Sequence, residues 1–383
     1  MVFSKSADDK IAQSDIRTMS IECEKRGGIN LSQGICDLAT PKPVLEGAKS
    51  AIDAEFNTYT RYDGAQELRE AISRKLSRQN GIKADPETEV VVSAGATGAM
   101  FCAALALLKP GDEVILFEPY YSYHVLTLNA VGAKPVFVKT NPPDWHFDLS
   151  ELEAKITSKT KGIIINTPSN PSGKVFGKEE LLAIGELCNK HGIIVFTDEI
   201  YEYFVYDGKK HISPASLYEL AERTVTISGY SKTYSITGWR IGYSACKKEW
   251  ATKIGHMNDL LYVCAPSPLQ LGVAQGINKL PQSFYESISL EYKRKRDLLC
   301  SALSDAGLKP HIPPGAYYVL ADAGALKGRD SHEKAMGLLE KTGIAAVPGR
   351  AFYSGKDGEN MLRFCFAKKD DVLKDACERL RNL

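Results

Sequence analysis

Six short apolar segments recur between about residues 90 and 245, and stretches of helical composition separate them. The segments are EVVVSAG, DEVILFEP, KPVFVKT, KGIIINTP, GIIVFTDEI and RTVTISGYS. They lack a strict alternation of apolar and polar residues, which is typical of strands buried on both faces of a sheet. Strands that alternate with helices favour parallel pairing. The pattern therefore predicts an α/β protein with a mostly parallel central sheet.

The C-terminal part of the chain has a different character. PPGAYYVLAD, GIAAVPG and MLRFCFA have the pattern of short antiparallel strands, and residues 371–383 have that of a closing helix. A chain of 383 residues also exceeds what one hydrophobic core usually fills. We predict a large domain over residues 45–285 and a small α+β domain formed by residues 1–44 and 286–383, with a charged helix over about residues 281–308 joining them.

Charge and composition favour a small-molecule ligand. Lys and Arg (48) nearly balance Asp and Glu (47), so no nucleic-acid partner is expected. The longest apolar runs, such as residues 192–196, are far shorter than the roughly 20 residues of a membrane span. Residues 1–10 lack the apolar core of a signal peptide, and the nine cysteines show no CxxC pair or metal-ligand spacing. We expect a cytoplasmic protein with reduced thiols, no membrane association and no metal.

A lysine follows the last of the six apolar segments. Lys232 stands in SGYSKTYSITGWR, and Arg240 follows eight residues later. A lysine beyond a strand is usually an exposed surface residue. However, α/β sheets bind ligands at the carboxyl ends of their strands, and a lysine there can attack a carbonyl group once its pKa is lowered. Arg240 has the planar set of donors that suits a phosphate.

A carboxylate follows the segment GIIVF in a similar way. Asp198 is either the cap of a helix or, with a cation as partner, a functional carboxylate. At the end of a buried strand it could keep a pyridinium nitrogen protonated, as pyridoxal chemistry requires. Tyr201 lies three residues later, about one helical turn away, and could reach the same ring.

Two further segments stand at strand ends. Residues 166–173, NTPSNPSG, are rich in turn formers and taken alone predict only a rigid turn. Residues 93–98, SAGATG, lead from a strand into a helix of small residues, where free backbone N–H groups can bind an anion. Neither segment contains GxGxxG or GK[ST], which disfavours an NAD-dependent dehydrogenase and a P-loop site.

Together these segments resemble the class I/II aminotransferase family of fold-type I pyridoxal-5'-phosphate (PLP) enzymes. The family pattern NxPxNPxG, then DxxY, then SK with Arg eight residues further on occurs in this order, and the resemblance covers essentially the whole chain. It implies a PLP-dependent homodimer with shared active sites. It also implies transfer of an amino group from an L-amino acid, such as aspartate or an aromatic one, to a 2-oxo acid such as 2-oxoglutarate by a ping-pong mechanism.

The resemblance also implies roles for residues at the cofactor. Lys232 would bond the cofactor covalently and later move the substrate proton, and Asp198 would pair with the pyridine nitrogen. Tyr201 and Asn170 would hydrogen-bond the phenolic oxygen of the ring. Tyr121 would stack on the ring, although it could instead be a core tyrosine. The implied phosphate site comprises Gly95, Ala96, Thr97, Ser231 and Arg240, with Tyr59 reaching in from a neighbouring subunit.

For the substrate, the resemblance implies that Arg363 binds the α-carboxylate. Gly34 matches the glycine that passes close to this carboxylate, and Asn170 would contact both cofactor and substrate. An acidic substrate needs a cation for its distal carboxylate, whereas an apolar one needs an aromatic pocket. The local cations are Arg61, Lys174 and Arg350, and the local tyrosines are Tyr59, Tyr62, Tyr121 and Tyr123.

The chain departs from the family pattern at three positions. Gly229 stands where a serine is frequent, Cys36 where a proline is common, and Arg350 where Ser or Thr is usual. Two other interpretations remain open. A β-eliminating lyase or a cyclopropane-forming synthase on the same fold would share Lys232, Asp198 and Arg363. A non-catalytic PLP-binding regulator would keep the fold as a sensor.

Overall fold

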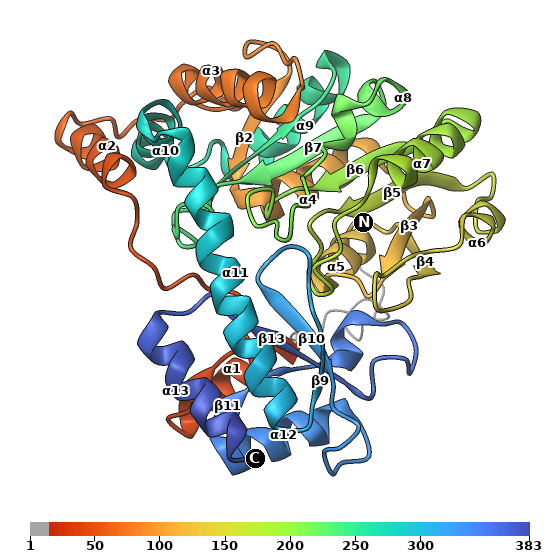
Figure 1. The fold of residues 1–383 in the computed structure, drawn as a ribbon. Coiled ribbons are helices and arrows are strands. Elements are labelled where there is room, and N and C mark those ends of the chain that lie inside the picture. The colour runs from red at the N-terminus through yellow and green to blue at the C-terminus, as the bar shows by residue number, and fades with distance from the viewer. Residues whose placement is uncertain (1–14) are drawn as a thin grey trace.

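A seven-stranded sheet forms the centre of the larger lobe, in the upper half of Figure 1. Its strands are β2 (Val90–Ala94), β3 (Glu113–Glu118), β4 (Lys134–Lys139), β5 (Thr160–Asn166), β6 (Ile194–Asp198), β7 (Thr224–Gly229) and β8 (Ile241–Ala245). Their order is β2-β8-β7-β6-β5-β3-β4. Only β8 runs antiparallel to its neighbours. The six apolar segments form the other six strands, which confirms the predicted α/β fold.

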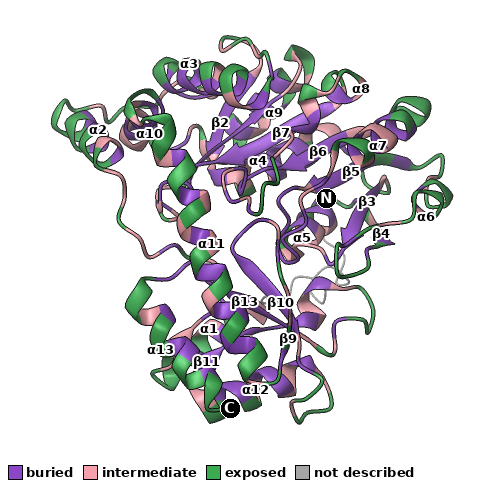
Figure 2. Cartoon of the chain, in the orientation of Figure 1, coloured by how far each residue is buried: buried purple, intermediate pink, exposed green. Residues whose placement is uncertain are grey.

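Helices cover both faces of this sheet, which explains why its strands are apolar throughout. The helices of the larger lobe are α2 (Lys42–Asp53), α3 (Gln66–Lys75), η2 (Leu76–Asn80), α4 (Gly95–Leu107), α5 (Ser122–Ala130), α6 (Leu149–Ala154), α7 (Lys178–His191), η3 (Pro214–Ser216), α8 (Tyr218–Ala221), α9 (Lys248–Tyr262) and α10 (Ser267–Lys279). In β5, Ile164 packs with residues of α4 and α9, whereas Ile163 and Ile165 pack with α7. The central strands are accordingly buried along most of their length (Figure 2).

The smaller lobe, in the lower half of Figure 1, contains two small sheets. Its elements are α1 (Asp15–Lys25), β1 (Ile29–Asn30), β9 (Lys309–His311), β10 (Tyr318–Asp322), α12 (Ser331–Thr342), β11 (Ile344–Ala345), β12 (Val347–Pro348), η4 (Gly349–Phe352), β13 (Met361–Cys365) and α13 (Asp370–Arg381). Strands β12, β13, β10 and β9 form an antiparallel sheet. The prediction for GIAAVPG was partly wrong, because β11 pairs in parallel with β1, a partner from the distant N-terminal segment.

A long helix, α11 (Gln282–Asp305), runs from the larger lobe into the smaller one and matches the predicted joining helix (Figure 1). The computed structural model describes residues 15–383, so residues 1–14 of the predicted small domain lie outside the described residues. The domain boundaries at 44/45 and 285/286 stay predictions. Within the described range, no helix combines the length and apolarity that crossing a bilayer requires.

Candidate active site

A cavity of about 450 Å³ lies at the carboxyl ends of the parallel strands. Asn166 at the end of β5 is in register with Asp198 at the end of β6, so the segments that follow these strands begin side by side. Tyr318 of β10 and Arg363 of β13, both from the smaller lobe, line the same cavity. Twelve residues singled out in the sequence line this cavity: Gly34, Ala96, Thr97, Tyr121, Tyr123, Asn170, Asp198, Tyr201, Ser231, Lys232, Arg240 and Arg363.

Two other predicted residues lie outside the lining. Gly95 is adjacent to it at the start of α4, where its φ is +75° and a Cβ atom would lie 2.5 Å from Nη2 of Arg240. Tyr59 lies between α2 and α3 and is 79% exposed. Its predicted role depends on a neighbouring subunit and stays a prediction.

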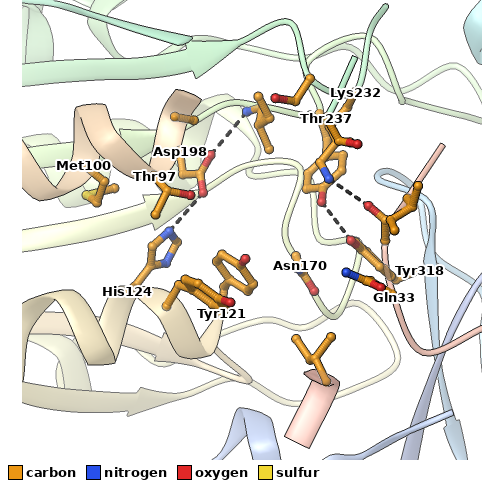
Figure 3. A pocket seen from close by; sticks show the side chains of 18 of the residues that line it. Gln33, Thr97, Met100, Tyr121, His124, Asn170, Asp198, Lys232, Thr237 and Tyr318 are labelled. Carbon is orange, nitrogen blue, oxygen red and sulfur yellow. Dashed lines mark hydrogen bonds and ion pairs between the residues drawn. The ribbon is translucent and has the colours of Figure 1, made fainter. Parts of the chain in front are cut away.

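Lys232 presents its amine to the cavity just beyond β7. Its Nζ donates a hydrogen bond to the carbonyl oxygen of Gly34 at 2.8 Å (Figure 3). Burial lowers the pKa of Lys232, and the positive charges of Arg240 and Arg363 lower it further. A lower pKa leaves more of the amine neutral at a given pH, and the neutral amine is the form that attacks a carbonyl carbon.

Gly34 and Gly229 each stand where another chain segment approaches closely. A Cβ atom at Gly34 would lie 1.8 Å from the hydroxyl oxygen of Tyr318, so a side chain there would displace this tyrosine. A Cβ atom at Gly229 would lie 2.9 Å from Cα of Gly242 in β8. The close approach of β7 and β8 therefore explains why Gly229 departs from the serine of the family pattern.

The carboxylate of Asp198 is held by a histidine that the sequence reasoning missed. Nε2 of His124 in α5 lies 2.9 Å from Oδ2 of Asp198 (Figure 3). Tyr121 lies edge-on to His124, with ring centroids 5.3 Å apart. His124 follows Tyr121 by three residues, and this helical spacing was the one local signal that could have indicated it.

A pair of tyrosines borders the cavity beside Lys232. The hydroxyl oxygens of Tyr201 and Tyr318 lie 3.0 Å apart (Figure 3). Burial raises the pKa of Tyr201 well above its ordinary value and raises that of Tyr318 to about 12. Both hydroxyl groups therefore stay protonated near neutral pH and can donate hydrogen bonds. The sequence indicated Tyr318 only as part of a strand, because its partner Tyr201 comes from the other lobe.

Arg363, in β13 of the smaller lobe, provides a buried positive charge in the cavity wall. It is 1% exposed, and Nη1 donates to Oδ1 of Asn170 at 2.8 Å while Nη2 donates to the carbonyl oxygen of Ser32. Its Nε has no hydrogen-bond partner, and no carboxylate within residues 15–383 forms an ion pair with it. Because an unpaired buried charge is costly, this geometry suits an incoming carboxylate.

Replacing Arg363 by lysine should lower kcat/KM for amino acids about 10- to 100-fold, because a lysine keeps the charge but loses the planar pair of donors. Steady-state kinetics would measure this loss. The absorbance of the bound cofactor should not change, since no contact with the cofactor is assigned to Arg363. A variant with unchanged kcat/KM would contradict this assignment of the carboxylate site.

The region around Arg240 has the features of an anion cradle. Arg240 has a φ of 56°, and its Nη1 donates to the carbonyl oxygen of Thr237 at 3.0 Å. Helix α4 starts beside it, and a Cβ atom at Gly242 would lie 2.3 Å from the backbone nitrogen of Ala96. Glycine at position 95 leaves room for the guanidinium group of Arg240, and glycine at position 242 leaves room for the start of α4. A guanidinium group and free N–H groups at a helix start together bind phosphate well.

The side chains around the cavity fit PLP. Lys232 offers an amine for its aldehyde carbon, Asp198 a carboxylate for its ring nitrogen, and Arg240 with the start of α4 a site for its phosphate. No group of three or more His, Cys, Asp or Glu side chains within the described residues could hold a metal ion.

A buried polar network, also missed in the sequence, lies behind the segment 198–202. Lys75 donates to both carboxylate oxygens of Glu202, and Nδ2 of Asn80 donates to one of them at 2.9 Å. Oε2 of Glu199 lies 2.8 Å from Nε2 of His211. These contacts tie the backbone that carries Asp198 and Tyr201 to α3 and η2.

Comparison with known proteins adds independent support. The family model described as aminotransferase class I and II matches residues 26–380. Kynurenine–oxoglutarate transaminase 3 of Rattus norvegicus is 36% identical over 389 residues, covering 92% of this chain and 84% of its own. Aspartate aminotransferase of Pyrococcus abyssi is 35% identical over 381 residues, covering 98% of this chain and 96% of its own.

Solved structures agree with these relatives. N-succinyldiaminopimelate aminotransferase from Mycobacterium tuberculosis superposes with a TM-score of 0.95 at 34% identity, covering 98% of each chain. YbdL from Escherichia coli, reported to have a methionine aminotransferase function, has a TM-score of 0.94 at 32% identity and covers all of both chains. The resemblance inferred from the motifs is thereby confirmed. The chain belongs to the class I and II aminotransferase family and is a PLP-dependent aminotransferase that acts on amino acids and 2-oxo acids.

Proposed function

We propose that this enzyme carries PLP on Lys232 and moves amino groups from a broad set of L-amino acids, including aspartate or aromatic ones, to 2-oxoglutarate. The observation that carries this proposal is the position of two cations on one cavity: the Lys232 amine, with its lowered pKa, and the buried guanidinium of Arg363, which lacks a carboxylate partner within residues 15–383. The first suits a carbonyl carbon and the second an α-carboxylate.

Each side chain of the cavity has a separate role in the proposed reaction. When bound, PLP supplies an electron sink for the bond that breaks at Cα of the amino acid. Arg363 and Asn170 hold the α-carboxylate and so orient Cα. Lys232 would take the proton from Cα of the amino acid and deliver it to the carbon derived from the aldehyde of PLP, and would move a proton in the reverse direction when the 2-oxo acid reacts. Asp198, oriented by His124, keeps the ring nitrogen protonated.

Two neighbouring hydroxyl groups tune the same site. Tyr201 and Asn170 would hydrogen-bond the phenolic oxygen of the ring, and Tyr318 orients Tyr201. Tyr121 would cover one face of the ring, with Tyr123 stacked at a centroid distance of 5.2 Å. Ala96, Thr97 and Ser231 would complete the phosphate site begun by Gly95 and Arg240.

The choice of substrates draws on the cavity wall and on the relatives. Ile16, Ile35 and Tyr123 form an apolar part of the lining, which suits aromatic or other apolar side chains. The similar proteins named above act, by their names, on kynurenine with oxoglutarate, on aspartate, or on methionine. This range supports a broad donor specificity with 2-oxoglutarate as the acceptor.

Incubation of the enzyme with an amino acid and no 2-oxo acid tests the reaction type. We expect the cofactor to convert once to its amine form, and subsequent addition of 2-oxoglutarate to restore the initial absorbance. The measurement is the absorbance change per active site together with an assay for ammonia. Continuous release of ammonia and a 2-oxo acid without any acceptor would contradict transamination and indicate a β-eliminating lyase.

The assembly and location are also proposals. We propose a homodimer in the cytoplasm, in which the exposed Tyr59 of each subunit completes the phosphate site of its neighbour. We propose no nucleic-acid or membrane partner, because the net charge is +1 without any basic block.

A further inference from the structure

Among residues 15–383, four lysine or arginine side chains line the cavity, but the reaction as proposed uses only three of them. Lys232, Arg240 and Arg363 have been assigned to the cofactor carbon, the phosphate and the α-carboxylate. The fourth is Arg17 in the first turn of α1. Asp198 is the one carboxylate among the lining residues that the structure describes, and it faces His124. The positive charge of Arg17 is therefore not balanced by any group assigned so far.

The side chain of Arg17 is exposed and forms no ion pair or hydrogen bond with another residue of the range 15–383. Its neighbour Asp15 is the carboxylate nearest to it in the sequence. However, both oxygens of Asp15 bind Arg350, at 3.1 Å from Nη2 and 3.3 Å from Nε. Residues two apart on a helix also point in different directions. Arg17 thus keeps its donors free for a ligand in the cavity.

The other cations considered for this task are already neutralised. Arg61 binds both carboxylate oxygens of Asp63, at 2.6 and 2.7 Å. Lys174 binds Glu180 at 2.7 Å. Arg350 binds Asp15, as described above. None of these three cations is among the residues that line the cavity.

The first turn of α1 is fixed against the cavity wall. Ile16 packs against the cluster that contains Phe352 and Val347, and the pair of Arg350 with Asp15 holds the turn from the other side. Arg350, which departs from the family pattern, therefore acts here as an anchor for α1. The fixed backbone places Arg17 at the cavity while its long side chain stays free to move.

We propose that Arg17 binds the distal carboxylate of dicarboxylic substrates with four or five carbons, while Arg363 binds the α-carboxylate. This inference rests on the proposed function of the cavity and names the residue that selects the acidic substrate. An apolar side chain would instead contact Ile16, Ile35 and Tyr123, with Arg17 turned toward solvent. One cavity would then accept both an apolar amino donor and a dicarboxylic acceptor.

The test compares Arg17→Gln with the wild-type holoenzyme. The kcat/KM for 2-oxoglutarate should fall about 10- to 100-fold, because a charge-assisted contact is lost. The kcat/KM for 4-methyl-2-oxopentanoate, which has no distal carboxylate, should stay within about twofold. Arg17→Lys should lose less activity with 2-oxoglutarate than Arg17→Gln, since it keeps the positive charge and loses only the planar set of donors. Arg78→Gln removes an exposed arginine of η2, outside the lining, and should change neither value.

Calorimetry gives a second measurement that does not depend on turnover. Glutarate, an unreactive dicarboxylate, should bind the wild-type holoenzyme about 10- to 100-fold more tightly than it binds Arg17→Gln. Equal losses with both oxo acids, or equal affinities for glutarate, would overturn the role of Arg17. A wild-type enzyme that binds glutarate through Arg17 but transfers no amino group to any acceptor would overturn the proposed function and leave the role of Arg17 standing.

Discussion

Lys232→Ala should lower kcat for amino transfer by at least about 10³-fold, because one side chain supplies both the covalent attachment of the cofactor and the base for the Cα proton. The amine faces the cavity, and its pKa is lowered by burial and by Arg240 and Arg363. No other lysine lines the cavity among residues 15–383. Single-turnover absorbance after mixing with an amino acid would measure the loss directly.

A matched control uses another lysine that follows a strand of the same sheet. Lys248 comes shortly after β8 but is exposed and lies outside the cavity lining. Lys248→Ala should therefore leave kcat unchanged. If Lys232→Ala kept full activity, or kept the absorbance of a covalently attached cofactor, the assignment of the anchor would be wrong.

Glu202→Gln should lower the free energy of unfolding by about 3–5 kcal/mol at neutral pH, because it leaves the buried amine of Lys75 without its carboxylate. The side chains of Lys75 and Glu202 are 2% and 6% exposed. Denaturant titration would measure the change. The double variant Lys75→Met/Glu202→Gln should recover most of the loss, since it removes both charges.

The pH dependence of this effect has a definite sign. Burial by itself would raise the pKa of Glu202, but Lys75, His211 and Asn80 outweigh burial and bring the pKa below its ordinary value of 4.5. A carboxyl group with a lowered pKa in the folded state stabilises the protein above its unfolded pKa. This contribution is lost as the pH falls through the pKa of Glu202 in the folded state. The unfolding free energies of the wild type and of Glu202→Gln should therefore converge at that pH.

An exposed pair on α13 supplies the control for stability. Asp375 binds Arg379 at 2.8 Å, and both side chains are more than 40% exposed. Asp375→Asn should leave the unfolding free energy nearly unchanged, because solvent screens such a pair. A loss for Glu202→Gln as small as that for Asp375→Asn would contradict the importance of the buried pair.

Most of the sheet could be predicted from the sequence because a strand buried on both faces is a continuous apolar run, which can be recognised locally. Each of the six apolar runs became a strand. Asp198 ends β6, and Asn170 and Lys232 follow β5 and β7, whose ends lie at the same edge of the sheet. Strand β8 was missed because its five residues, IGYSA, mix small and polar types that local pattern does not distinguish from a loop. The pairing of β1 with β11 joins segments far apart in the sequence, so no local sequence pattern indicates it either.

The residues missed at the site share a physical reason. His124, Tyr318 and Arg17 each matter through a partner or a cavity that another part of the chain supplies. The pairs of Arg61 with Asp63 and of Lys174 with Glu180 join residues only two and six positions apart, but the sequence does not show whether such neighbouring side chains turn toward each other. A sequence lists the charged residues, but only the tertiary structure shows which of them are neutralised.

The most direct test of the central claim is to reduce the holoenzyme with borohydride, digest it and locate the cofactor by mass spectrometry. Borohydride makes the bond between an amine and the cofactor permanent, so the mass of the modified peptide identifies the lysine. We expect the modification on the peptide that contains Lys232 and on no other. Modification of a different lysine, or none at all in an active enzyme, would contradict the assignment of Lys232.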